Sequence, residues 1–175
     1  MRWLFSIAAL SLTCCVGHER IAMASDKELN AWHYPVRLED DIAHEVPGFG
    51  GYWLDRNQTT INVHLVDLKD STAARSAIEL AQARYRQRFD LNRSFVFHKG
   101  DYNFLQLDIW RCAIPKAMDE NFDGYYGSSV SSSSNRIHLT VGDEATERRV
   151  RKVMAKLGIP RKAVEFERGS PIRFL

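Results

Sequence analysis

The sequence has almost no excess of charge of either sign. Its 24 lysines and arginines are set against 22 aspartates and glutamates, which gives a formal net charge of +2 over 175 residues. Such a chain carries no strong overall field, so its total charge favours no class of partner. The apolar fraction of 45% is near the globular average, which excludes global disorder and a collagen-like or coiled-coil composition. The chain is long enough for one compact domain, or for two small subdomains that share a core.

The sequence also lacks a hydrophobic run long enough for a permanent membrane anchor. The apolar stretch Trp3–Val16 is broken by Gly17-His18-Glu19-Arg20, whereas a spanning helix needs about 20 apolar residues. Arg2 precedes this stretch, and Ala22-Met23-Ala24 follows it as an A-x-A cleavage site. This pattern is typical of a signal peptide. We therefore expect residues 1–24 to be removed and the protein to be exported, to a periplasm or to the outside of the cell.

Cysteine is scarce, with three residues in the whole chain. Cleavage after Ala24 leaves only Cys112, so we expect no intramolecular disulfide and interpret Cys112 as a small buried apolar residue. A lipoprotein signal, with Cys14 or Cys15 as the lipidated residue, is the alternative. Residues 10–13, which precede these cysteines, fit that motif poorly.

The usual sequence patterns of catalytic and metal sites are missing. The histidines have no H-E-x-x-H or H-x-x-E-H spacing, and C-x-x-C and G-x-S-x-G are absent. No glycine-rich loop opens a helix in the way that a phosphate cradle requires. We therefore expect no metal, no cofactor and no catalytic residue. A small hydrolase using Cys112 or a histidine remains an alternative, and His64 and His138 would approach each other only if two sheets paired.

Comparison of the chain with itself shows an internal repeat. Residues 51–67 align without gaps on residues 127–143, at an offset of 76. Each copy contains a short strand, a polar turn and a second strand with strict alternation, which predicts a β-hairpin. The apolar residues of the second strands are Ile61, Val63 and Leu65 in one copy and Ile137, Leu139 and Val141 in the other. The serine run 128–134 falls on the first strand and turn of the second hairpin, where serine is ordinary turn chemistry.

A helix is expected after each hairpin. The first extends from Thr72 to about Arg88, capped by Asp70 or Ser71, with a stripe formed by Ala74, Ala77, Ile78, Ala81 and Tyr85. The second extends from Glu144 to Leu157, with Asp143 as its cap and Gly158 and Pro160 as its stop signals. A further strand follows each helix, at 94–100 and 163–169. The predicted fold is therefore α+β, with two tandem ββαβ half-repeats whose antiparallel sheets are each covered by a helix.

Two other segments complete the domain organisation. Phe104, Leu107, Trp110 and Ile114 lie at helical spacing, which favours a helix over a strand, with Asp101 as its cap. Residues 25–48 contain a short amphipathic segment formed by Leu38, Ile42 and Val46. We expect a signal peptide (1–24), an N-terminal segment (25–48), a first α/β repeat with an added helix (49–118) and a second repeat (119–175).

The second predicted helix carries most of a basic cluster, which includes Arg148, Arg149, Arg151, Lys152 and Lys156. Glu144 and Glu147 lie in its first turn, so this order of charges is the one that the helix dipole favours. A solvated face accounts for the cluster, and docking on an anionic envelope surface is the functional alternative. Nucleic acid is not an expected partner, because aromatic residues are not interleaved with these charges.

Four segments carry a family resemblance: Val46-Pro-Gly-Phe-Gly-Gly-Tyr-Trp-Leu-Asp55, Asn135-Arg-Ile-His-Leu139, Leu157-Gly-Ile-Pro160 and Val164-Glu-Phe166. They resemble the pro-regions of exported bacterial chymotrypsin-like serine proteases. The resemblance covers about residues 46–175. It implies two small α/β subdomains in tandem that inhibit a protease and assist its folding. In that family the sheet pairs with an edge of the protease and the tail enters the active-site cleft. These 175 residues contain no protease domain, and serines occupy the first strand of the second hairpin where acidic and apolar residues are expected.

We therefore predict an exported, non-catalytic protein-binding module whose partner is an exported serine protease. Binding would use an edge strand or the tail residues Ile172, Arg173, Phe174 and Leu175. A last strand with Ile172 and Phe174 packed inward is the simpler interpretation of that tail.

Overall fold

A computed structural model describes residues 34–84, 93–118 and 122–170. The expected signal peptide, Cys14 and Cys15, Tyr85 and the tail residues Ile172, Arg173, Phe174 and Leu175 lie outside the described residues. The elements, in chain order, are α3 (Tyr34–Glu45), β1 (Phe49–Leu54), β2 (Thr60–Leu65), the 3-10 turn η1 (Leu68–Asp70), α4 (Ser71–Arg84), β3 (Ser94–Lys99), α5 (Phe104–Lys116), β4 (Tyr125–Ser131), β5 (Arg136–Val141), α6 (Glu144–Lys156), the 3-10 turn η2 (Arg161–Ala163) and β6 (Val164–Arg168).

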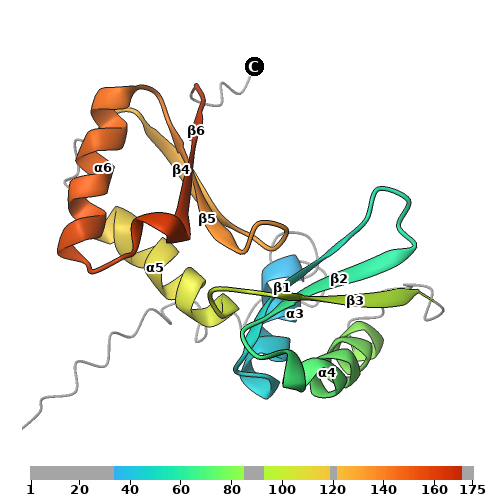
Figure 1. The fold of residues 1–175 in the computed structure, drawn as a ribbon. Helices are drawn as coiled ribbons and strands as arrows, with labels where there is room; N and C mark the ends of the chain where they lie inside the picture. Colours follow the sequence, from blue (N-terminus) through green and yellow to red (C-terminus); the bar gives the residue numbers. More distant parts are fainter. Residues whose placement is uncertain (1–33, 85–92, 119–121, 171–175) are drawn as a thin grey trace, which may run out of the picture. The chain divides into compact units, whose positions relative to one another are not determined.

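The strands form two three-stranded sheets, in the orders β1-β2-β3 and β4-β5-β6 (Figure 1). Each sheet with its intervening helix is a ββαβ unit, which confirms the predicted α+β fold. The expectation of antiparallel sheets is wrong for the third strands. β3 is parallel to β2, and β6 is parallel to β5. The reason is that a strand–helix–strand connection within one sheet returns the chain in the same direction.

The two hairpins share one pairing register at the offset found in the sequence. A β-bulge interrupts each of them at the same place, between Phe49 and Gly51 in one and between Tyr125 and Gly127 in the other. The two glycines have φ angles of 115° and 154°, in a region that L side chains rarely adopt. The two aligned sequence segments therefore also have the same backbone geometry.

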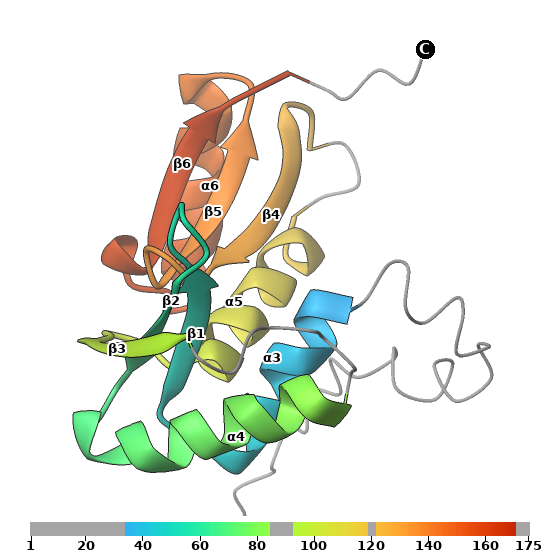
Figure 2. The ribbon, with the colours of Figure 1, turned by 90° about the vertical axis from the view of Figure 1, so that its right-hand side faces the viewer.

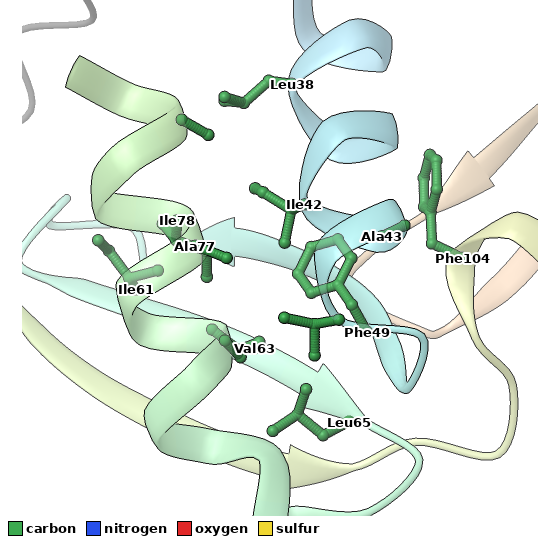
Figure 3. Packing of buried hydrophobic residues seen from close by; sticks show 13 residues of the cluster. Leu38, Ile42, Ala43, Phe49, Ile61, Val63, Leu65, Ala77, Ile78 and Phe104 are labelled. Atoms are coloured by element: carbon green, nitrogen blue, oxygen red, sulfur yellow. The ribbon is translucent and has the colours of Figure 1, made fainter. Parts of the chain in front are cut away.

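The first core lies between one face of the β1-β2-β3 sheet and the helices α3 and α4 (Figure 3). The sheet contributes Phe49, Ile61, Val63 and Leu65, and α4 contributes the predicted stripe Ala74, Ala77, Ile78 and Ala81. Leu38 and Ile42 of α3 and the following Val46 are buried in the same cluster. The amphipathic part of segment 25–48 thus belongs to the first core.

The second core lies between the β4-β5-β6 sheet and α6, and α5 contributes residues to it. Its fully buried residues include Leu139 at the centre of the sheet and Val150 and Met154 on α6. The helix predicted between the repeats is confirmed as α5. Its first residue, Phe104, packs in the first core, whereas Leu107 and Ile114 pack in the second. This helix therefore connects the two cores.

The starts of several helices are stabilised by a side chain that accepts a hydrogen bond from a backbone N–H a few residues later. Asp143 caps α6, because its side chain accepts a 2.7 Å hydrogen bond from the Thr146 N–H. Asp67 caps the 3-10 turn η1, because its side chain accepts a 3.0 Å hydrogen bond from the Lys69 N–H, and η1 ends at Asp70, directly before α4. One other expected cap is wrong. Asn103 caps α5, whereas Asp101 instead pairs with Arg136 at 2.6 Å.

The backbone conformation of Gly158, at the C-terminal end of α6, indicates how much stability a substitution there would remove. Gly158 has a φ of 69°, and the N–H groups of Gly158 and Ile159 bond to the carbonyls of Ala155 and Met154. A Cβ at position 158 would meet nothing within 4 Å. Gly158→Ala is therefore expected to lower the free energy of unfolding by about 1 kcal/mol through backbone strain alone. Urea denaturation measures this loss, and a change near zero would contradict the expectation.

Candidate protein-binding surface

In each three-stranded sheet the first strand of the hairpin, β1 or β4, lies at one edge. The edge strands β1 and β4 contain no charged residue, and charge is a common device for blocking pairing at a sheet edge. The opposite edge of the second sheet, β6, carries Glu165, Glu167 and Arg168. The chemistry of these strands favours β1 or β4 as a surface for another strand.

The edge of β1 is occupied by the chain itself. The Gly50 carbonyl accepts a 3.0 Å hydrogen bond from Nδ2 of Asn135, which lies in the β4–β5 turn. The Tyr52 N–H donates to the Glu39 carboxylate of α3. Ser132 packs so closely against Gly51 that a Cβ there would lie 2.8 Å from its Oγ. These contacts leave no room for a partner strand along the first half of β1.

The equivalent part of β4 has no hydrogen bond to a hairpin turn of the other unit among the described residues, although α5 packs against this strand. Tyr126 and Ser128 stand where Gly50 and Tyr52 stand in the first unit, and in the part of the chain that the structure describes they make no backbone–backbone hydrogen bond beyond the sheet. A Cβ placed on Gly127 would meet nothing within 4 Å. β4 forms the edge of the second sheet, and α6 covers one face of that sheet (Figure 2). β4 is therefore the candidate pairing edge.

The faces of the two sheets that lie opposite the cores differ in chemistry. On the first sheet Trp53, His64 and His98 form a ring cluster, with centroid distances of 4.8 Å from Trp53 to His64 and 5.3 Å from Trp53 to His98. On the second sheet the Nε2 atom of His138 lies 2.5 Å from Glu165 and 3.2 Å from the Ser134 Oγ. His64 and His138 thus have separate partners. The two sheets remain separate three-stranded sheets.

The serine–histidine contact in the second unit does not have the geometry of a catalytic triad. The same ring nitrogen, Nε2 of His138, faces both the Ser134 hydroxyl and the Glu165 carboxylate. A triad needs the acid on one ring nitrogen and the hydroxyl on the other. Cys112 is half-buried, with its Sγ 3.3 Å from an Arg111 nitrogen. Within residues 34–84, 93–118 and 122–170, no group of three or more His, Cys, Asp and Glu side chains is placed to hold a metal ion.

Most of the arginines in the predicted basic cluster are engaged within the second unit. Arg151 and Arg168 both pair with Glu147, at 2.7 Å and 2.6 Å. Arg149 bonds to the Asp123 carbonyl and stacks on the Phe122 ring. Arg148 pairs with Glu144 in an exposed pair four residues apart. Lys152 and Lys156 are exposed and carry no ion pair within the described part of the chain, so the cluster presents less positive charge than its sequence suggests.

Sequence reasoning missed the residues that join the two units. The side chain of Asn135 makes four hydrogen bonds: it accepts from the Asp101 and Tyr102 N–H groups and donates to the Gly50 and Tyr102 carbonyls. Ser132 donates to Glu39 at 2.5 Å, and its carbonyl lies 2.9 Å from Nδ1 of His64. The only sequence signal for this junction is an asparagine at the end of a serine turn, which is also an ordinary turn residue.

Comparison with known protein families and with curated proteins gives no match for this sequence. Among the described residues, no helix is both long and apolar enough to cross a membrane.

Proposed function

We propose that this protein is an exported, non-catalytic binding module that inhibits an exported serine protease or assists its folding. The partner would add an extended strand to the edge of β4. The observation that carries this proposal is the difference between two equivalent edges. β1 is covered by Asn135 and Glu39, whereas the uncharged strand β4 has no hydrogen bond to a hairpin turn of the other unit among the described residues.

Strand addition suits this edge for a physical reason. Main-chain hydrogen bonds supply much of the affinity of such a complex, and they need an edge without charged side chains. Ser129 points to the face of the second sheet that lies opposite the core and is exposed. A lysine at this position would add a charge and a long side chain at the proposed contact.

Ser129→Lys is therefore expected to weaken partner binding by about tenfold, which corresponds to about 1.4 kcal/mol. The matched control is Glu167→Lys, which places a lysine at an exposed position of the opposite edge strand β6. If the control loses affinity while Ser129→Lys does not, the pairing edge is β6 and the proposed use of β4 is wrong.

The partner class is tested with residues 25–175, the expected mature chain, as bait in the exported fraction of the native host. Bound material is washed first at low and then at high salt. A retained serine protease whose activity falls on addition of the bait would support the proposal. Retention of salt-labile envelope material alone would instead favour docking through the basic helix, because surface charge interactions are screened by salt.

A further inference from the structure

The tip of the β4–β5 hairpin, Ser132–Asn135, is one contact between the second unit and the first, in addition to α5, which packs in both cores. Asn135 is 2% exposed, and all its side-chain donors and acceptors are used by residues of the first unit or of the segment before α5. Ser132 extends the same contact to α3 through Glu39 and to β2 through His64. We call these residues, Ser132, Asn135, Glu39 and His64, the hairpin latch.

The hairpin latch contains two titratable groups. Glu39 accepts hydrogen bonds from the Ser132 hydroxyl and from the Tyr52 N–H, and the carboxylates of Asp40 and Asp108 face it from α3 and α5. Arg111 neutralises part of the charge of Asp108, at 2.6 Å. On the other side of Ser132, His64 is faced by His98, Arg136 and Asp101.

Burial is the main influence on both groups, and it opposes charge. Burial raises the pKa of Glu39 from 4.5 to about 7, against the effect of its two hydrogen bonds. Burial likewise lowers the pKa of His64 below 6.5, with a further contribution from His98 and Arg136. Both side chains therefore resist ionisation while the hairpin is in place.

We propose that the hairpin latch is a pH-gated contact, closed in mildly acidic surroundings and released as the pH rises to neutrality. The proposal rests on the contacts of the latch and not on the identity of the partner. Release of Asn135 frees the Gly50 carbonyl at the start of the uncharged edge strand β1, whereas the Tyr52 N–H keeps its bond to Glu39 within the first unit.

The direction of the pH dependence follows from proton linkage. Glu39 has a raised pKa in the closed state, so its contribution to closure is complete below pH 4.5 and is lost as the pH rises through about 7. His64 has a lowered pKa, so its contribution is present above pH 6.5 and is lost as the pH falls. Between pH 4.5 and pH 6.5 the two contributions therefore change in opposite directions, and above pH 6.5 only the loss of the Glu39 contribution remains.

Amide hydrogen exchange by NMR on the full chain tests the proposal. Opening of the latch exposes the Asp101 and Tyr102 N–H groups, which donate to Asn135. In Glu39→Gln the side chain stays neutral, so the ratio of wild-type to variant opening at these two amides should rise about fiftyfold between pH 5 and pH 7.5. The matched control is Glu45→Gln on the exposed side of α3, for which the ratio should stay constant.

The Ile159 amide, which bonds to Met154 within the second unit, separates local opening from global unfolding. Its protection should not follow the ratio measured at Asp101 and Tyr102. A constant ratio in Glu39→Gln, or an equal change at Ile159, would overturn the proposal. Ser132→Ala supplies a second variant: loss of its hydroxyl should raise opening at Asp101 and Tyr102 at pH 5, where Glu39→Gln has little effect.

Discussion

Replacement of Asn135 by glycine is expected to lower the free energy of unfolding by about 3 kcal/mol. Asn135 has a φ of 55°, a conformation that glycine adopts freely, so this change removes the side chain without adding strain. The loss leaves the Asp101 and Tyr102 N–H groups and the Gly50 carbonyl without their partners. Each buried polar group left unsatisfied costs roughly 1–3 kcal/mol, part of which water recovers.

Gln58→Gly is the matched control for this substitution. Gln58 lies in the equivalent turn of the first unit with a φ of 56°, but it is exposed. Its replacement should change the free energy of unfolding by less than about 1 kcal/mol. Urea denaturation followed by tryptophan fluorescence measures both variants. Equal effects of the two substitutions would mean that Asn135 acts only as a turn residue and does not join the units.

Leu139→Ala is expected to cost about 3 kcal/mol of stability. Leu139 is fully buried on the central strand of the second sheet and lies in the same cluster as Val150, Met154 and Leu107. Truncation removes apolar contacts and leaves a cavity that the strand cannot close, and such changes cost roughly 2–5 kcal/mol.

The control for Leu139→Ala is Leu80→Ala on the surface of α4, where the leucine is 62% exposed. Its effect should stay within about 0.5 kcal/mol. Thermal and urea unfolding together measure this difference. A small effect of Leu139→Ala would contradict a tightly packed second core.

The burial of Leu139 could be predicted from the sequence, whereas the contacts of Asn135 could not. Leu139 follows from strict alternation along one strand, because side chains on a strand point alternately to opposite faces and one face is buried. Asn135 does not follow from any local pattern. Its partners at Gly50 and Tyr102 lie 85 and 33 residues away, and only the packing of one unit on the other brings them together.

The candidate pairing edge, β4, could also be predicted only in part from the sequence. An uncharged edge strand can be read from Tyr125–Ser131, but the same reading applies to Phe49–Leu54. In the basic helix, the pair between Glu147 and Arg151 follows from their four-residue spacing. The second pair, with Arg168, depends on β6 lying beside the start of α6 and could not be counted in advance.

Residue order accounts for the local elements of this protein: two hairpins in one register, the helices that follow them, the cap at Asp143 and the C-terminal end of α6 at Gly158. These features depend on periodicity and on contacts between residues a few positions apart. Long-range packing accounts for which uncharged edge is covered, for the entry of α5 into both cores, and for the position of the half-buried Glu39 beside Ser132. Such contacts join residues far apart in the chain, so their geometry depends on how whole elements pack and not on local residue order.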